Sequence, residues 1–323
     1  MTTPIEPTSL DLPAVTPPLK TSPTRARLAF YGWCVFFLAM FAGPLVALLK
    51  LALGSDLHSH ALLIPFISAY LLHTQRERLP AIYQANIGSG VALTVLSGVT
   101  AAFALGLFGK APEGTAYVST MMLALVGLIN AGGFLFLGSN WMRAAAFPMT
   151  FLVFLAPLPE VWESALENGL KLASSEASAI LFEISGTPFL RDGNIFQLPG
   201  IVLEVAQECS GIRSSYVLFI TSIVAAQLFL HSPWRRIVLV GLVIPLGIIR
   251  NGFRILVIGL LCVHVGPEMI HSIIHRRGGP LFFALSLIPL FLILWLLRRG
   301  DRAAGSTLPD VSPKEPPRSE TAP

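Results

Sequence analysis

The fold class is decided by residues 237–263, IVLVGLVIPLGIIRNGFRILVIGLLCV, an apolar run whose only charged residues are Arg250 and Arg254. A helix that spans a bilayer needs about 20 largely apolar residues, and this run is longer than that. Similar runs recur, so we expect helices at 28–53, 61–72, 91–108, 116–137, 144–155, 214–230, 237–263 and 280–297. The second and fifth runs are short enough for re-entrant or tilted segments, so the count of eight is open by one or two.

The composition of the whole chain agrees with this class. Its 323 residues are 54% hydrophobic and 12% charged, with a mean hydropathy of +0.70, which excludes an ordinary soluble domain. The sequence therefore predicts an all-α polytopic membrane protein of about eight transmembrane helices. We expect one transmembrane domain at 28–299 between disordered cytoplasmic tails at 1–27 and 300–323, because both tails are rich in Pro, Ser and Thr.

The positions of lysine, arginine and cysteine indicate the membrane topology and exclude some classes of partner and site. The net charge is +4, but lysine and arginine occur singly or in pairs, as topology signals do, and not as a nucleic-acid-binding surface. With the N-terminus inside, most of them fall on the inner side, so both termini are expected in the cytoplasm. Cys34, Cys209 and Cys262 lie far apart and fit neither a disulfide scaffold nor a zinc-finger spacing.

The longest connection, residues 156–210, lies outside the cytoplasm in this topology. Residues 157–183 alternate charged and apolar residues at helical spacing, as an amphipathic helix on the membrane surface does. After Gly186 the pattern predicts short strands at 189–191, 194–198 and 201–206, with turns at Asp192-Gly193 and Pro199-Gly200. This small β-hairpin leads the chain to residues 208–211, Glu-Cys-Ser-Gly.

Cys209 is the first candidate for chemistry. It lies where the outer connection enters an apolar helix, and a helix N-terminus favours the thiolate, which is the nucleophilic form of cysteine. The alternative is a buried structural cysteine, because free cysteine is among the most buried residue types. Cys34 and Cys262, each in the middle of an apolar run, fit that alternative and are assigned no role.

Arg254 is the second candidate. An arginine at membrane depth costs roughly 2.5–3.5 kcal/mol even on the lenient insertion scale, so it needs a partner or a wet cavity. Arg250, Asn251 and Arg254 are spaced so that they share one face of a helix. The alternative is an ion pair inside the helix bundle, although few acidic residues lie at that depth.

Histidines supply the third candidate. Those that fall on the outer side with Cys209 are His58, His60, His264, His271 and His275. His275 precedes the last apolar run and so lies at the mouth of the last helix. Near a cysteine, a histidine can act as general acid or base, and an arginine can hold a tetrahedral oxyanion. A solvated loop residue is the alternative for each histidine.

Together these residues resemble the exosortase and archaeosortase family. The resemblance rests on residues 208–213 (ECSGIR), then 251–254 (NGFR), then His275 with Gly279 and Phe282-Phe283, in the family's order and on the last three helices. Residues 58–65, HSHALLIP, resemble the family's first outer loop, although Ala61 stands where glycine is common. The resemblance covers 28–299, and its specific part is 202–283.

The resemblance implies a cysteine-type peptidase or transpeptidase of the bacterial inner membrane, with its active site outside the cytoplasm. Its substrates would be secreted proteins that end in a sorting signal: a short motif, often with proline, then one transmembrane helix and a basic cluster. By carry-over, Cys209 is the nucleophile, Arg254 the oxyanion stabiliser and His275 the general acid/base, with His271 as its rival. The candidate substrate-binding residues are Arg213, Asn251 and His60. The implied partners are the secreted substrate, the lipid bilayer and an amine acceptor of unknown identity, and no cofactor, metal or nucleic acid is expected.

Two other classes remain open from the sequence. The pairs His58/His60 and His271/His275 have spacings that zinc ligands use, which would make a metal-dependent membrane hydrolase. Arg250 and Arg254 on a polar path would suit a transporter or a polysaccharide-export component. The lack of a visible internal repeat argues against the transporter.

Overall fold

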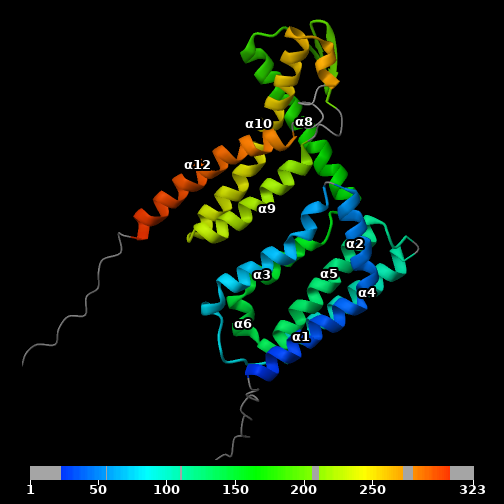
Figure 1. The fold of residues 1–323 in the computed structure, drawn as a ribbon, viewed down its shortest axis with the longest axis vertical. Coiled ribbons are helices and arrows are strands. Elements are labelled where there is room, and N and C mark those ends of the chain that lie inside the picture. Colours follow the sequence, from blue (N-terminus) through cyan, green and yellow to red (C-terminus); the bar gives the residue numbers. More distant parts are fainter. Residues whose placement is uncertain (1–22, 56, 110, 206–210, 272–278, 306–323) are drawn as a thin grey trace, which may run out of the picture. The chain divides into compact units, whose positions relative to one another are not determined.

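The computed structural model describes residues 23–55, 57–109, 111–205, 211–271 and 279–305 (Figure 1). The chain divides between Glu160 and Val161 into two compact units. They are called here the N-unit, up to Glu160, and the C-unit, from Val161.

The N-unit is built around α5 (Thr115–Gly132). This helix packs against α1 (Pro23–Met40), α2 (Ala42–Gly54) and α4 (Ile87–Phe108). Small residues allow α4 and α5 to pack closely, since a Cβ on Gly127 would overlap Ser97 Oγ. The shorter elements are η1 (Ser59–Leu62), α3 (Ile64–Thr74), η2 (Arg76–Arg78), the π-turn η3 (Gly133–Leu137), α6 (Ser139–Ala144), α7 (Ala146–Phe151) and η4 (Leu152–Leu155).

Two prolines each lie four residues after the end of a helix. The run at 28–53 is bent by 70° between α1 and α2. The ring of Pro44 would clash with the carbonyl group four residues earlier, on Met40, and Met40 is the last residue of α1. Pro148 has the same relation to Ala144, where α6 ends, and the helix predicted at 144–155 is found as α7 continued by η4, Ala146–Leu155. The single continuous helix predicted at 28–53 was therefore wrong.

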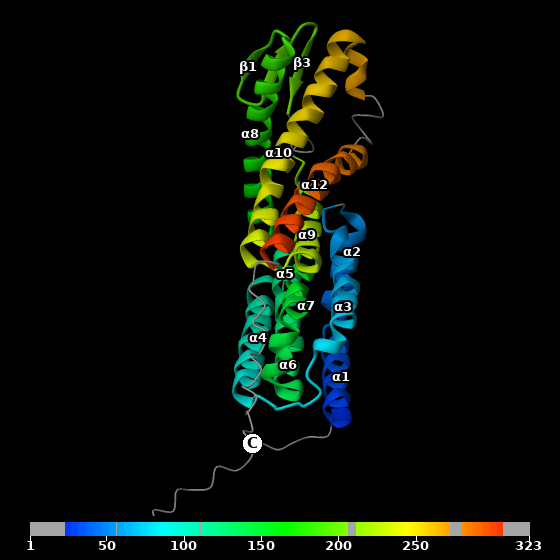
Figure 2. The same cartoon turned by 90° about the vertical axis from the view of Figure 1, so that its left-hand side faces the viewer.

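The axis of the C-unit is α10 (Pro233–His264). It lies beside α9 (Ile212–Phe229) and α12 (Gly279–Gly305), as Figures 1 and 2 show. Leu218, Leu239 and Leu290, one from each helix, are almost fully buried in the core between them. The helical ends differ from the predicted tails at two places: α1 already begins at Pro23, and α12 continues to Gly305.

A small sheet and α8 (Glu160–Ser185) cover the last third of α10. The strands β1 (Leu190–Asp192), β2 (Ile195–Leu198) and β3 (Ile201–Glu204) pair antiparallel in the order β1-β2-β3. They lie where the alternating pattern placed them, with Gly193 and Gly200 at positive φ in the two turns. Phe196 and Leu203 of the sheet share one buried core with Phe182 of α8 and with Ile255 and Ile258 of α10. This assembly is called the sheet cap (Figure 1).

The helix predicted at 157–183 is confirmed as α8, but its packed face is not apolar. Its buried residues are Ser174, Ser175, Ser178 and Phe182. Val161 and Ile180, two of the apolar positions that define the predicted stripe, are exposed. The small serine side chains let α8 approach α10 at Gly252, where an added Cβ would lie 2.9 Å from Ala177 Cβ. The exposed apolar side chains of α8 are available for contact with lipid.

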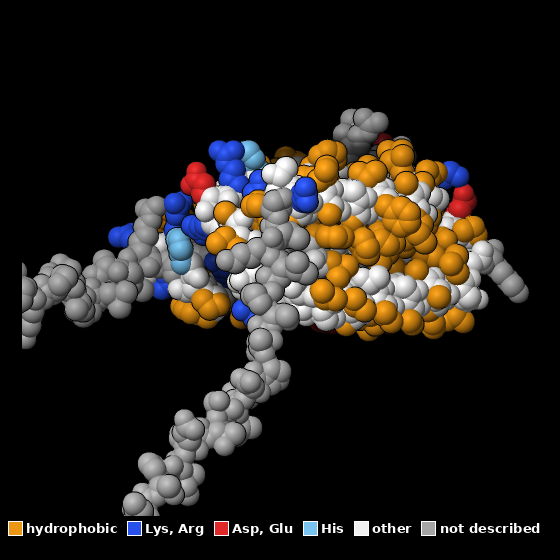
Figure 3. Space-filling model, turned by 90° about the horizontal axis from the view of Figure 1, so that it is seen from below, with side chains coloured by type: hydrophobic (Ala, Val, Ile, Leu, Met, Phe, Trp, Pro, Cys, Tyr) orange, Lys and Arg blue, Asp and Glu red, His pale blue; other side chains and the backbone are white. Residues whose placement is uncertain are grey.

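Within the described residues, five helical segments are long and apolar enough to cross a membrane: α4, α5 with η3, α9, α10 and Pro280–Gly300 of α12. The number rises to seven if each of two bent helix pairs is one span. Figure 3 shows many exposed hydrophobic side chains over a broad part of one face, with white backbone and other atoms between them, as on a lipid-facing surface. The chain is thus a multi-pass, mainly helical membrane protein. The predicted second helix is α3, whose 11 residues are too few for a span, so the count of eight stays a prediction.

Candidate active site

Gly211 fixes the start of α9. It is the N-cap residue and has a φ of 73°, a left-handed conformation that glycine adopts without strain. Its carbonyl oxygen accepts hydrogen bonds from Ser215 N at 3.0 Å and from Ser214 Oγ at 3.1 Å. The residue that follows Cys209-Ser210 is therefore a rigid point of the backbone.

Two side chains of α10 pack directly on Gly211. Arg250 Nη2 donates hydrogen bonds to the Gly211 carbonyl oxygen at 3.3 Å and to Ser215 Oγ at 3.2 Å. A Cβ added to Gly211 would lie 2.9 Å from Asn251 Oδ1. Both α10 residues are buried. The tertiary structure thus brings the end of the Cys209 motif onto the face of α10 that carries Arg254.

This close contact predicts that Gly211→Ala destabilises the protein more than Gly186→Ala does. Both glycines have a φ near +70°, and the left-handed conformation costs an alanine about 1–2 kcal/mol at either site. No atom lies within 4 Å of a Cβ on Gly186, whereas a Cβ on Gly211 meets Asn251 and Arg250. We expect Gly211→Ala to lose about 1–3 kcal/mol more, by the usual cost of overpacking. Thermal unfolding in detergent measures both variants, and equal midpoints would contradict the contact.

Arg254 lies one helical turn beyond Arg250, at the base of the sheet cap. It is partly buried, and the next residue, Ile255, belongs to the core of the cap. Because α10 is helical throughout, Arg250, Asn251 and Arg254 project from one face, as their spacing predicted. Arg213 is exposed in the first turn of α9.

Other predicted site residues lie outside the described residues. They are the predicted nucleophile Cys209, with its motif neighbours Glu208 and Ser210, and the predicted general acid/base His275. The backbone of the rival histidine, His271, ends the 3₁₀ helix η6 (Pro267–His271). The roles of Cys209 and His275 stay predictions.

Comparison with known families assigns the chain. The model of the transmembrane exosortase family (Exosortase_EpsH) matches residues 52–292, which include α9, α10 and the contact between Gly211 and Arg250. The chain belongs to the transmembrane exosortase family. This confirms the resemblance seen in the sequence and supports a role as a membrane transpeptidase or protease. No curated protein and no solved structure matches the chain.

In this exosortase, the two histidines of the motif at residues 58–65, His58 and His60, are buried inside the N-unit. His60 Nδ1 donates to the Leu57 carbonyl oxygen at 2.7 Å, which leaves Nε2 as the acceptor of the neutral ring. Desolvation lowers the pKa of both His58 and His60, and the neighbouring charge of His60 lowers that of His58 further. Both rings are therefore neutral at pH 7. His60 is held by contacts of the N-unit, while Arg213, Asn251 and Arg254 belong to the C-unit.

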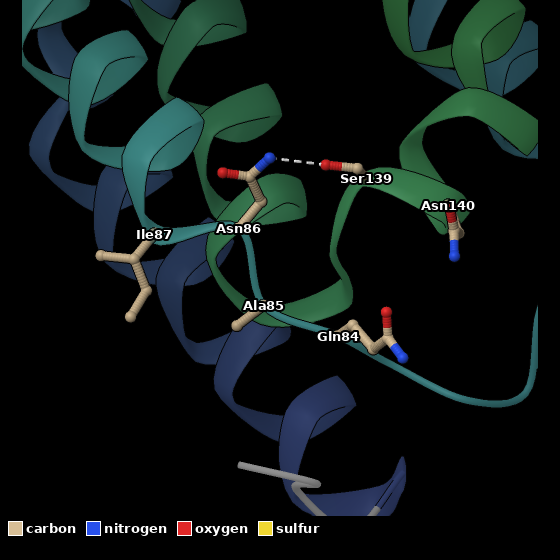
Figure 4. Close-up of a pocket in the computed structure, with 6 residues that line it drawn as sticks. All are labelled: Gln84, Ala85, Asn86, Ile87, Ser139 and Asn140. Carbon is tan, nitrogen blue, oxygen red and sulfur yellow. Dashed lines mark hydrogen bonds between the residues drawn. The ribbon is translucent and has the colours of Figure 1, made fainter. Parts of the chain in front are cut away.

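A cavity of about 390 Å³ opens elsewhere in the N-unit (Figure 4). Asn86 Nδ2 donates to Ser139 Oγ at 2.7 Å at its edge. Its other lining residues are Gln84, Ala85, Ile87 and Asn140. None of them titrates near neutral pH, and Ser139 Oγ, their one hydroxyl, accepts the hydrogen bond from Asn86. The segment follows Arg76 and Arg78, on the side expected to be cytoplasmic. We assign it no chemistry.

No three His, Cys, Asp or Glu side chains of the described part of the exosortase come together in a way that could hold a metal ion. Gly211 and Arg250 were not among the predicted site residues, although their sequence positions had been noted, Arg250 on one helix face with Asn251 and Arg254. The signal for Arg250 was present, since a second arginine one turn from Arg254 in an apolar helix also needs a partner.

Proposed function

We propose that this exosortase cleaves the C-terminal sorting signals of secreted proteins on the extracytoplasmic side of the bacterial inner membrane, with Cys209 as nucleophile. The observation that carries the proposal is the packing of Gly211 on Arg250 and Asn251. Cys209 precedes Gly211 by two residues, a stretch of chain that reaches at most about 7 Å. This supports a common site for Cys209 and Arg254.

The reaction uses the three groups in turn. His275 takes the proton of the Cys209 thiol, and Sγ attacks the carbonyl carbon of the peptide bond beside the substrate's membrane anchor. The carbonyl electrons move onto oxygen, where Arg254 stabilises them. When this oxyanion collapses, the C–N bond breaks and His275 protonates the leaving nitrogen. The anchor departs as an amine, and an acyl thioester remains on Cys209. An amine acceptor or water then attacks the thioester and restores the thiol.

The basic end of the C-unit supports this orientation. Arg235 at the start of α10 donates to the Leu297 carbonyl oxygen of α12 at 3.2 Å, and Arg298 and Arg299 follow directly. Because basic residues accumulate on the cytoplasmic side, this end is proposed to be inside. The sheet cap covers the opposite end of α10, so it and Arg254 face outward. The C-terminus is then cytoplasmic, and the distribution of basic residues along the sequence supports the same side for the N-terminus. Arg213 and Asn251 remain the proposed substrate contacts of the C-unit, and His60 is a separate proposal in the N-unit.

A co-expressed reporter tests the proposed function. The reporter ends in a proline-containing motif, a transmembrane helix and a basic tail, and cleavage is followed as a size shift on a gel. We expect cleavage only with the exosortase present and only when the reporter keeps its transmembrane helix. A panel of proline-containing motifs that all stay uncut beside membrane-inserted enzyme would count against the proposal.

The same assay decides which histidine acts. We expect His275→Ala to lower the initial rate about 100-fold or more, because a positioned general acid/base contributes that much, and His271→Ala to stay near the parental rate. The reverse pattern would transfer the role to His271. Matching amounts of both variants in the membrane fraction are the control.

A further inference from the structure

Arg250 is a buried cation, and one nitrogen of its guanidinium group lacks a hydrogen-bond partner among the described residues. Only 7% of the residue is exposed. Nη2 binds the Gly211 carbonyl oxygen and Ser215 Oγ, but Nη1 is buried without a hydrogen-bond partner among residues that the structure describes. None of the described carboxylates forms an ion pair with Arg250 either. A buried charge without a counter-charge is costly, so this site is built for an anion.

Two neighbours increase the positive potential around Arg250. Arg254 lies one turn along the same helix face, and its charge repels that of Arg250. Gly211, which Arg250 contacts, is the N-terminus of the 18-residue helix α9 and so the positive end of its dipole. One negatively charged oxygen bound by both arginines would relieve their mutual repulsion.

We propose that Arg250 and Arg254 form a two-arginine oxyanion site, in which Arg250 Nη1 donates to the negatively charged oxygen of the tetrahedral intermediate. The inference rests on the proposed function, since attack by Cys209 creates this oxygen. The oxyanion exists only during the reaction, which accounts for an Nη1 that is unsatisfied in the resting enzyme. Donors held in place before the charge develops are the strongest form of electrostatic catalysis. Arg250 is then a second catalytic arginine.

Steady-state kinetics test the shared site. A purified enzyme in proteoliposomes is given a synthetic peptide with the sorting motif and its transmembrane helix, and kcat and KM are measured for Arg250→Gln, Arg254→Gln and the double variant. We expect Arg250→Gln to lower kcat about 100-fold with little change in KM, as loss of one oxyanion donor does. The double variant should be no slower than about the worse single variant, because both arginines serve one oxygen.

Two further variants separate catalysis from folding. Arg250→Lys keeps the charge and should recover part of the lost kcat, and Arg299→Gln, which removes an arginine from the far end of α12, should behave as the parent. If Arg250→Gln raises KM and lowers the thermal midpoint while kcat holds, Arg250 only anchors the Gly211 turn and the proposal is overturned. Multiplicative losses in the double variant would also overturn it. If the parent leaves the peptide uncut, the proposed function fails together with this inference, whereas a parental kcat in Arg250→Gln defeats this inference alone.

Discussion

Replacing Cys209 by alanine is expected to stop cleavage of the sorting-signal reporter, with a rate loss of roughly 10⁴-fold or more. The alanine side chain has no nucleophile, so neither the acyl thioester nor the departure of the anchor can follow. Arg250 and Arg254 would then face a substrate carbonyl that nothing attacks. A time course of the reporter on a size gel, with enzyme amount normalised in the membrane fraction, measures the loss.

The control for this variant is Cys34→Ala. Cys34 lies in α1 of the N-unit and is partly buried, so its replacement removes a thiol without touching the C-unit. We expect Cys34→Ala to cleave the reporter at the parental rate. Cleavage by Cys209→Ala at a comparable rate would refute the assignment of the nucleophile.

Replacing Arg254 by glutamine is expected to lower kcat about 100- to 1,000-fold, the usual loss when one oxyanion donor is removed. Glutamine keeps a hydrogen-bonding side chain but not the charge that the developing oxyanion needs. Arg254 is not among the residues of the sheet-cap core, which begins at the next residue, Ile255, so the cap should stay folded. The measurement is kcat with the synthetic peptide in proteoliposomes.

Two further variants accompany this measurement: Arg254→Lys, which keeps the charge, and Arg299→Gln, which is the control. Lysine keeps the charge but loses the planar fork of donors, so an intermediate kcat is expected. Arg299 stacks over the Trp295 ring near the end of α12, and its loss should leave kcat unchanged. A parental kcat in Arg254→Gln would remove Arg254 from the reaction.

Several parts of this exosortase could be predicted because they depend on local sequence. The apolar runs around Ser214–Leu230 and Ile237–Val263 gave helices close to α9 and α10. The alternation after Gly186, with glycine in both turns, gave the three strands. The breaks at Pro44 and Pro148 were also local, and the rule that a proline ring clashes with the carbonyl group four residues earlier would have located them.

The packed face of α8 could not be predicted in the same way. In water, the apolar face of a helix marks the side that packs against protein. In a membrane, lipid also accepts apolar side chains. Hydropathy therefore cannot distinguish the side of a helix that packs against protein from the side that faces lipid. The structure buries Ser174 and Ser178 because small side chains permit close contact at Gly252, and it leaves Val161 and Ile180 exposed.

The sequence alone determined the class of the protein, its family and the residue types available for chemistry, because these follow from composition and from short motifs in order. Only the tertiary structure decided which of these residues meet. The hydrogen bond from Arg250 to the Gly211 carbonyl oxygen joins residues 39 positions apart on two helices. Such a contact depends on how α9 and α10 pack and on the left-handed turn at Gly211, and no local pattern encodes it. The buried, unsatisfied Nη1 of Arg250 became visible only through that packing.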